Sequence, residues 1–207
     1  ATIRLLLATL SFPLYFLAFE TDAPAIPRLP GMRPFQPLPF QFSVHVLRAP
    51  RGPRAEGLLE HREHLHGDPE DPRPELARAL IAAVGEEGSI VAYNAAFERG
   101  VLEALASQVP SLAPELLSRA ARLWDLLPIF REHYLHPGFG GSASLKKVLP
   151  VLAPSLSYEP LAIGEGAEAQ AAWNRLIYLE PCEERTELSK ALREYCRLDT
   201  LAMVEIY

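Results

Sequence analysis

The sequence predicts a mixed α/β fold in which helices flank a sheet. Three strand-like segments follow one another between residues 14 and 64, helix and strand patterns then alternate, and two helical patterns close the chain. That order is typical of one mixed sheet packed by helices. The length of 207 residues is enough for one large domain with its own core, so we interpret residues 1–207 as a single domain excised from a longer protein.

The first part of the chain supplies the three consecutive strands. Residues 2–10 are amphipathic and predict a short helix, and the dense apolar run 14–19 predicts a buried central strand. Residues 22–39 contain six prolines and predict an ordered loop. Residues 40–47 alternate as a strand does, and residues 57–64 predict a weaker third strand.

The same apolar run allows one alternative interpretation. Arg4 precedes an uncharged segment, residues 5–19, and Ala23-Pro24-Ala25 resembles a signal-peptidase site. The segment is too short to cross a membrane and is interrupted by Pro13, so a buried strand is the favoured interpretation.

The remaining elements alternate. Asp71-Pro72-Arg73-Pro74-Glu75 combines a cap candidate, early prolines and a first-turn acid, and it predicts a helix that ends near Val84. The other predicted elements are strands at 89–93 and 123–125, helices at 95–107, 114–121, 126–134, 144–152, 165–179 and 183–207, and a loop at 136–144.

Composition sets limits on function. The net charge of −6 argues against a broadly basic nucleic-acid binder. It does not exclude a nuclease, because such a site is itself acidic and bound cations reverse its local charge. Cys182 and Cys196 are too few for a disulfide framework, which favours a reduced, cytoplasmic setting.

Four side chains with the chemistry of a metal-dependent hydrolase lie at element ends. Ala18 and Glu20 are two residues apart in a strand and therefore point to the same face. Glu98 lies one turn into the helix that follows strand 89–93, and Tyr195 and Asp199 are four apart on one helix face. Carboxylates are the hard ligands that Mg²⁺ and Mn²⁺ prefer, and two such ions serve phosphodiester cleavage in many nucleases. Glu20, Glu98 and Asp199 are therefore candidate metal ligands.

Each of these side chains also has an ordinary alternative role. Glu20 alone would be a solvated strand-end acid, and Glu98 alone would be an acid stabilised by the helix dipole. Tyr195 and Asp199 alone would lie at the rim of the core and on the surface. Asp125 is better explained as a structural strand-end acid than as a ligand. The joint occurrence of these residues, in this order on these elements, is what favours a metal site.

Three motifs carry a resemblance to a known superfamily. They are Leu17-Ala18-Phe19-Glu20, Tyr93-Asn94-Ala95-Ala96-Phe97-Glu98 and Tyr195-Cys196-Arg197-Leu198-Asp199. In that order they resemble the motifs of the DnaQ-like 3′→5′ exonucleases, in the branch with tyrosine in its third motif (DEDDy). The resemblance implies a ribonuclease-H-like mixed sheet flanked by helices and two Mg²⁺ or Mn²⁺ ions. It also implies catalytic positions at Ala18, Glu20, Glu98, Tyr195 and Asp199.

Further segments, among them Arg33-Pro34-Phe35 and Ser144-Leu145-Lys146-Lys147, narrow the resemblance. They look like a bacterial domain family of unknown function that is regarded as DnaQ-like and often lies beside a RecB-like nuclease region of the CRISPR-associated type. That family has an aspartate where this chain has Ala18, and Glu98 stands where most DnaQ-like enzymes have aspartate. The resemblance therefore implies a catalytic domain inactivated at Ala18, with weak or absent metal in this chain.

Candidate substrate contacts lie beside these motifs. Phe19, Thr21 and Phe97 are candidates to cradle a terminal nucleotide, because stacking accepts any base, although Phe19 and Phe97 also fit core positions. Asn94 is as well placed to cap a helix as to touch substrate. Lys146 and Lys147 begin a helix, where positive charge and backbone N–H groups favour phosphate, with a solvated basic pair as the alternative.

A histidine-rich segment completes the candidates. His61, His64 and His66 have a spacing that fits no standard zinc site, so an exposed edge strand is the favoured interpretation.

The leading functional hypothesis is a metal-dependent 3′→5′ exonuclease domain that acts on nucleic acid. Single-stranded DNA 3′ ends are the favoured substrate, RNA is possible, and no membrane is involved. The alternatives are a non-catalytic nucleic-acid-binding module, or a partner-docking module, whose nuclease site has decayed.

Overall fold

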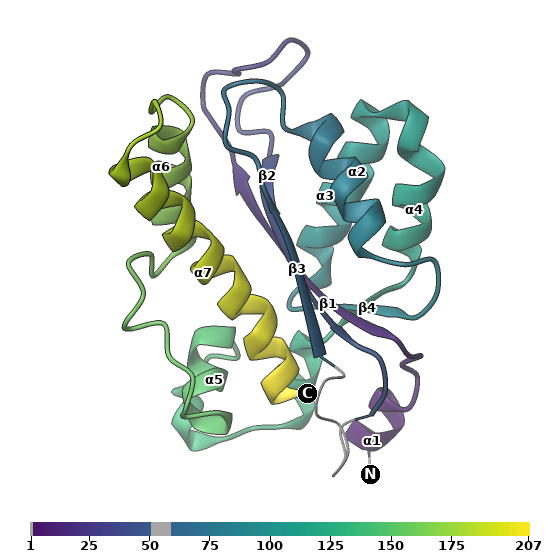
Figure 1. Ribbon diagram of the computed structural model, residues 1–207. Helices are drawn as coiled ribbons and strands as arrows, with labels where there is room; N and C mark the ends of the chain where they lie inside the picture. Colours follow the sequence, from purple (N-terminus) through teal and green to yellow (C-terminus); the bar gives the residue numbers. More distant parts are fainter. Residues whose placement is uncertain (1, 51–58) are drawn as a thin grey trace.

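The computed structural model describes residues 2–50 and 59–207 and is built on one five-stranded sheet (Figure 1). The strand order is β3-β2-β1-β4-β5. The β1–β2 and β2–β3 pairs are antiparallel, and the β1–β4 and β4–β5 pairs are parallel. The strands are β1 (Leu14–Asp22), β2 (Leu38–Leu47), β3 (Leu59–Leu65), β4 (Ser89–Ala92) and β5 (Leu123–Asp125). This mixed sheet confirms the predicted α/β class and is consistent with a ribonuclease-H-like arrangement.

Helices cover both faces of the sheet. In Figure 1 the helices labelled α2, α3 and α4 lie on one side of the sheet, and α7, drawn in yellow, runs along the other with α5 and α6. The first layer is α2 (Arg73–Ala83), α3 (Ala95–Gln108) and α4 (Ala113–Ala121), and the second is α5 (Leu145–Leu152), α6 (Gly166–Leu176) and α7 (Glu183–Ile206). Shorter elements are α1 (Thr2–Leu7), η1 (Pro110–Leu112), η2 (Ile129–His133) and η3 (Pro137–Phe139). Among the residues the structure describes, no helix is both long and apolar enough to cross a membrane.

The predicted elements are present, with differences at their ends. The third strand begins at Leu59 and ends at Leu65, and residues 57 and 58 of its predicted range lie outside the described residues. The helix predicted at 126–134 is a single π-helical turn, Ile129–His133, closed by a hydrogen bond from Tyr134 N–H to Ile129 O (2.8 Å). The first helix ends at Leu7 rather than near residue 10.

Strand β1 divides the core between the two layers. Tyr15, Leu17 and Phe19 pack with α2, α3 and α4, whereas Leu14 and Phe16 pack on the other face of the sheet. The strand continues to Asp22, beyond the predicted apolar run, because it keeps pairing with β2 through a bulge after Glu20. Bulges re-aim strand ends next to functional sites, and this one lies directly beside the predicted metal motif.

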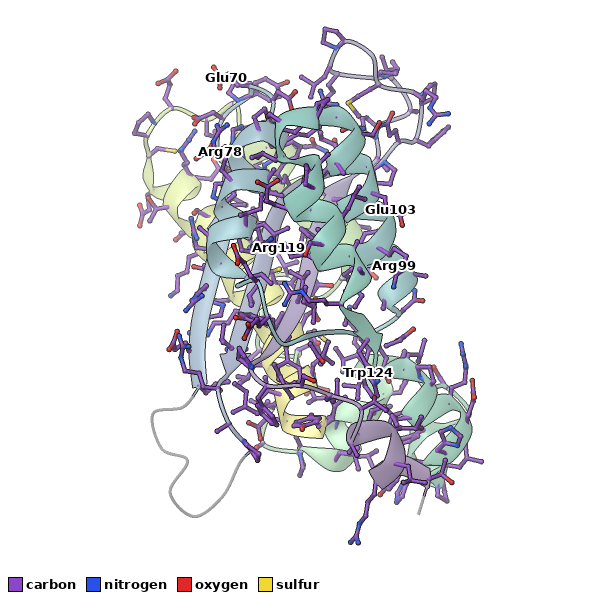
Figure 2. The ribbon with its side chains drawn as sticks, turned by 90° about the vertical axis from the view of Figure 1, so that its right-hand side faces the viewer. Glu70, Arg78, Arg99, Glu103, Arg119 and Trp124 are labelled. Atoms are coloured by element: carbon purple, nitrogen blue, oxygen red, sulfur yellow. The ribbon has the colours of Figure 1, made fainter. Side chains whose placement is uncertain are left out.

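A buried arginine closes the first helical layer. Arg119 of α4 is 4% exposed and donates to the carbonyls of Val84 (2.9 Å) and Ile81 (3.3 Å) at the end of α2. These carbonyls lack partners within their own helix, so the guanidinium satisfies groups that would otherwise be buried and unpaired. Figure 2 views this layer, with Arg119 labelled together with Arg78, Arg99 and Glu103.

Buried polar side chains fix α7 on the opposite face. The Thr200 hydroxyl lies 2.7 Å from Ser43 Oγ and 2.8 Å from His45 Nδ1, and Gln41 Nε2 donates to Leu192 O (3.0 Å). Burial lowers the pKa of His45 to about 3, with His61 adding to the shift, so the ring is neutral at pH 7. This network sets the position of the helix that carries Tyr195 and Asp199.

Candidate carboxylate and metal site

Strand order brings the predicted motifs to one edge of the sheet. Strands β1, β4 and β5 are mutually parallel, so their carboxyl ends lie on the same side, where ligands bind in open α/β sheets. Strand β1 pairs with β4 from Leu14 to Phe16, and β1 then continues beyond the end of this pairing. Glu20 therefore lies beyond the end of β4, where the chain turns into α3 and Glu98.

Helix α7 crosses β1 on the face that Ala18 and Glu20 share. The Cys196 thiol contacts the Ala18 carbonyl at 3.9 Å, and the Asp199 carboxylate contributes to raising the pKa of Glu20. Ala18 retains some exposed surface, whereas Glu20 is 8% exposed. Strand alternation predicted that Ala18 and Glu20 share one face of β1, and helix periodicity predicted that Tyr195 and Asp199 share one face of α7. In the structure these two faces lie against each other.

Glu20, Glu98 and Asp199 form what we call the carboxylate cluster. Burial, and then the neighbouring Asp199, raises the pKa of Glu20 to about 8. Burial also raises the pKa of Glu98 to about 8, with Asp125 and Asp199 adding to it. The pKa of Asp199 rises to about 6 through burial, against the opposing effects of a Tyr158 hydrogen bond and Lys146. Three acids from β1, α3 and α7 thus repel one another in a poorly solvated region.

The cluster is looser than a finished metal site. Among the described residues, a three-member group with its ligand atoms within 4.8 Å of one another occurs elsewhere, at His64, His66 and Glu75. Glu20, Glu98 and Asp199 do not have one ligand atom each within 4.8 Å of the other two. Carboxylates repel one another, so they do not draw together without a cation between them.

The carboxylate cluster nevertheless has features that suit a hard cation. One Glu98 oxygen, Oε2, is buried without a hydrogen-bond partner among the described residues. An unpaired buried acceptor is costly, and a divalent ion is the partner that carboxylate oxygens favour. Glu20, Glu98 and Asp199 can thus hold a hard cation, with fewer ligands than a complete site has.

Three further side chains surround the cluster. Lys146 Nζ donates to Gly164 O (2.6 Å) and lies 3.5 Å from the Tyr195 hydroxyl. It also stands over the rings of Tyr158 and Tyr195, at 5.3 and 5.4 Å from their centroids. The Tyr158 hydroxyl donates to Asp199 Oδ1 at 2.6 Å. The ammonium group thus offsets part of the negative charge, while Tyr158 fixes Asp199.

Sequence reasoning missed Tyr158. It lies in the irregular segment between α5 and α6, where no periodicity or motif marks it. Its contact with Asp199 joins residues 41 positions apart, so local sequence carries no signal for it.

The two phenylalanines, each predicted as a substrate contact or a core residue, differ in their placement. Phe19 is 5% exposed and packs edge-on against Phe42, with ring centroids 6.4 Å apart. It lies between Ala18 and Glu20 in the strand, so alternation sends it into the core on the other face. Phe19 is therefore a core residue and not a substrate contact. Phe97, in contrast, is 39% exposed beside Glu98 and is available to stack on a base.

The other predicted contacts are accessible to different degrees. Asn94 occupies the N-cap position of α3 in a left-handed conformation (φ 72°), but its side chain makes no capping hydrogen bond. Its own N–H donates to Asp125 Oδ1 (3.0 Å), which also accepts from Leu127 N–H (3.0 Å). Asp125 therefore has the structural role that the sequence favoured. Thr21 is half-buried, and Lys147 is exposed at the start of α5.

A cavity elsewhere on the molecule does not include the cluster. It has a volume of about 590 Å³ and lies against β3 and α7, lined by side chains that include His61, Glu63, Arg185, Arg193 and Arg197. Arg185 and Arg193 are engaged with backbone carbonyls and with Glu63 respectively. Cavity size alone therefore does not locate the site, and the carboxylate cluster has the stronger chemical case.

A family model matches the part of the chain that supplies the β1 and α3 residues of this site. The matching family is described as Domain of unknown function (DUF2779), and it covers residues 15–144, more than half of the sequence. The chain belongs to this family. No curated protein and no solved structure matches it. The matched range includes Ala18, Glu20 and Glu98 and ends before Tyr195 and Asp199.

The raised pKa values predict a measurable loss of stability at high pH. Glu98 has a folded pKa of about 8 and an unfolded value near 4.5, so the native state binds more protons between these pH values. The free energy of unfolding therefore falls as pH rises through this window. Without divalent metal, we compare the free energy of unfolding of Glu98→Gln with that of the parent. We expect the difference, in favour of Glu98→Gln, to be about 2–4 kcal/mol larger at pH 8.5 than at pH 4.5.

Urea unfolding at a series of pH values measures this effect. Glu103→Gln, an exposed change on the same helix (Figure 2), is the matched control and should follow the parent curve. Parallel curves for the parent and Glu98→Gln would contradict the buried, destabilised state of this acid.

Proposed function

We propose that this domain is a metal-dependent 3′→5′ exonuclease of the DnaQ-like, DEDDy type, and that Ala18 leaves the present chain inactive or nearly so. The proposal rests on one observation above all. Buried acids from β1, α3 and α7 couple electrostatically at the carboxyl end of parallel strands, next to Tyr195. Structural acids are normally paired with cations, whereas here the charge of Lys146 acts on Glu20 and Asp199 and contributes nothing resolved to Glu98.

Glu20, Glu98 and Asp199 would hold the Mg²⁺ or Mn²⁺ ions, with an aspartate at position 18 completing the set. When bound, the ions would supply water activation and stabilisation of the leaving oxygen. Tyr158 holds Asp199 by a hydrogen bond and so orients that carboxylate. Burial raises the pKa of Tyr195, so its hydroxyl stays protonated at neutral pH and can orient a water.

The residues around the cluster favour a single-stranded 3′ end as substrate. Phe97 is exposed beside Glu98 and can stack on the terminal base without selecting its identity. Lys147 is exposed at the start of α5 and can meet a phosphate. Single-stranded DNA is the favoured substrate, RNA is possible, and a RecB-like nuclease region is the expected neighbour in a cytoplasmic parent protein.

A second function is a candidate because one observation favours it. Ala18 leaves the chain a carboxylate short of the resembled motif, and the remaining acids are not a compact ligand set. A module that binds nucleic acid or a partner without cutting would have this composition. Such a module would bind single-stranded DNA but stay inert even when the missing carboxylate is supplied.

The decisive experiment uses the Ala18→Asp protein with Mn²⁺ and single-stranded DNA labelled at its 5′ end. A 3′→5′ exonuclease shortens the labelled strand in single-nucleotide steps, and a blocked 3′ end slows this. Internal cuts would instead identify an endonuclease. Binding without any cleavage would favour the non-catalytic module.

Metal affinity gives an independent prediction. We expect the present chain to bind Mn²⁺ weakly, with at most one ion, because removing a carboxylate lowers both charge and coordination number. Ala18→Asp should bind two ions, and its affinity for the first should be about tenfold higher or more. Calorimetric titration measures both, and Asp199→Asn should weaken binding in either background. Equal stoichiometry in the two proteins would contradict the assignment of position 18 as a ligand.

A further inference from the structure

A second group of metal-ligating side chains lies where the edge strand β3 meets the start of α2. One ligand atom from each of His64, His66 and Glu75 lies within 4.8 Å of the other two, a property that no other three such side chains have in the described part of the chain. None of the three belongs to the carboxylate cluster. The group therefore needs an explanation of its own.

Local structure explains why these residues meet. His64 and His66 are two residues apart, so they point to the same side of the sheet. The strand ladder continues to His66, whose N–H donates to Phe40 O (2.9 Å). Arg62, on the same side, donates to Ala83 O at the far end of α2 (2.7 Å). That side therefore faces α2, whose first turn carries Glu75.

Both imidazoles are poorly satisfied by the protein. The His66 side chain is 6% exposed, and its Nδ1 lies 3.1 Å from Glu75 Oε2. The Nε2 atoms of His64 and His66 are buried and have no hydrogen-bond partner among the described residues. A buried ring nitrogen without a partner costs folding free energy, so the protein alone does not satisfy either ring.

The chemistry of the group suits a transition-metal ion. Without metal, the Glu75 carboxylate accepts a hydrogen bond from His66 Nδ1, and an ion that replaces this proton would bind Nδ1 and Glu75 Oε2, atoms that lie 3.1 Å apart. His64 stacks on Phe42, with ring centroids 6.0 Å apart, and its buried, unpaired Nε2 is a further candidate ligand atom.

The neighbouring acid leaves the site open on one side. Both Asp71 oxygens are held by Arg73, at 2.7 and 2.6 Å, so Asp71 does not add a fourth ligand. Two imidazoles and one carboxylate with an open position match the ligand set that Zn²⁺ accepts together with a water. Zinc bonds of 2.0–2.1 Å put neighbouring ligand atoms roughly 3.4 Å apart. Closing from 4.8 Å needs a small movement, which Glu75 permits because its side chain is 60% exposed.

We propose that His64, His66 and Glu75 bind a zinc-type divalent ion that ties edge strand β3 to the start of helix α2. The site differs in ligand type from the carboxylate cluster. Imidazole nitrogens favour Zn²⁺ and Co²⁺, whereas all-oxygen ligands favour Mg²⁺ and Mn²⁺. It does not depend on the proposed nuclease activity, and it stands even if that activity is absent.

Cobalt titration of the full chain tests the site, because Co²⁺ bound in a four-coordinate protein site has a visible absorption band. A Cys182→Ser background removes an exposed thiol that also binds soft metals. We expect one equivalent of Co²⁺, displaced by Zn²⁺ and not by Mg²⁺. His64→Ala and His66→Ala should each lower the affinity at least tenfold, and Glu75→Gln by roughly 10–100-fold.

Two controls separate this site from the rest of the molecule. His61→Ala changes the same strand on its other face, where the ring contacts Ser43, and should leave the cobalt spectrum unchanged. Asp199→Asn should also leave it unchanged. Zn²⁺ should raise the thermal midpoint of the parent and not that of Glu75→Gln, a surface variant that folds irrespective of the metal.

Clear outcomes would overturn the proposal. Absence of stoichiometric Co²⁺ or Zn²⁺ binding in the folded parent would mean that the His66–Glu75 hydrogen bond serves packing alone. Binding that survives His64→Ala and Glu75→Gln, or that disappears with His61→Ala, would place the metal elsewhere.

Discussion

Replacing Ala18 by aspartate is expected to raise exonuclease activity on single-stranded DNA by about 10²–10³-fold or more with Mn²⁺. Position 18 shares a strand face with Glu20, lies against α7 at Cys196, and keeps some exposed surface. A carboxylate there would enter the cluster without displacing the core. Its charge would favour the divalent ions that neutralise the developing charge of the transition state.

Matched variants make this result specific. Ala18→Asn adds the same volume without the charge and should stay near the parent's activity. Asp199→Asn in the Ala18→Asp background should remove the gain. If Ala18→Asp is well folded, binds Mn²⁺ and still leaves every tested DNA and RNA intact, the exonuclease proposal fails and the non-catalytic module takes its place.

The added charge should also change stability. Without metal, the new carboxylate of the Ala18→Asp variant would face Glu20 and Asp199, acids whose pKa values are already raised. Ala18→Asp should therefore gain more in thermal midpoint from Mn²⁺ than the parent does, because ions that bind only the native state stabilise it.

Most of the fold was predictable because its elements have clear local periods. The buried run 14–19 and the alternating run 40–47 fall within β1 and β2, and the three-residue strand 123–125 matches β5. The β1 extension was not predictable, since it depends on pairing across the bulge near Glu20. The π-helical turn at Ile129–His133 likewise has no sequence signal that separates it from an α-helix.

The site was predictable where two residues share one element. Strand alternation relates Ala18 to Glu20, and helix periodicity relates Tyr195 to Asp199. The same alternation already excluded Phe19, which lies between two residues of the opposite face, so that signal was available and unused. Tyr158 could not be found, because its contact with Asp199 depends on how two distant segments pack.

The group of His64, His66 and Glu75 could not be predicted from the sequence either. The spacing of His61, His64 and His66 fits no standard zinc motif, and this favoured a plain edge strand. Strand alternation in fact separates His61 from the other two. The third member of the group, Glu75, comes from a helix and becomes a neighbour only in the folded chain.

Loss of the Tyr195 hydroxyl is the second large effect that we expect. In the Ala18→Asp background, Tyr195→Phe should lower kcat by roughly 10²–10⁴-fold, the range for a positioned acid, base or orienting group. The ring is 5% exposed within the core that also contains Trp173, so phenylalanine keeps its packing and the fold should be unchanged. Affinity for single-stranded DNA should change little, because stacking and phosphate contacts supply most of it.

Tyr158→Phe is the informative comparison for this variant. Tyr158 bonds directly to Asp199, whereas the hydroxyl of Tyr195 lies 3.5 Å from Lys146 Nζ. Removing the Tyr158 hydroxyl should weaken Mn²⁺ binding as well as turnover, since it frees a metal-ligand candidate. Tyr195→Phe should lower turnover and leave Mn²⁺ affinity intact. If Tyr195→Phe keeps full activity, its hydroxyl serves packing alone, and if Tyr158→Phe then abolishes turnover without loss of metal, Tyr158 is the residue that orients the water.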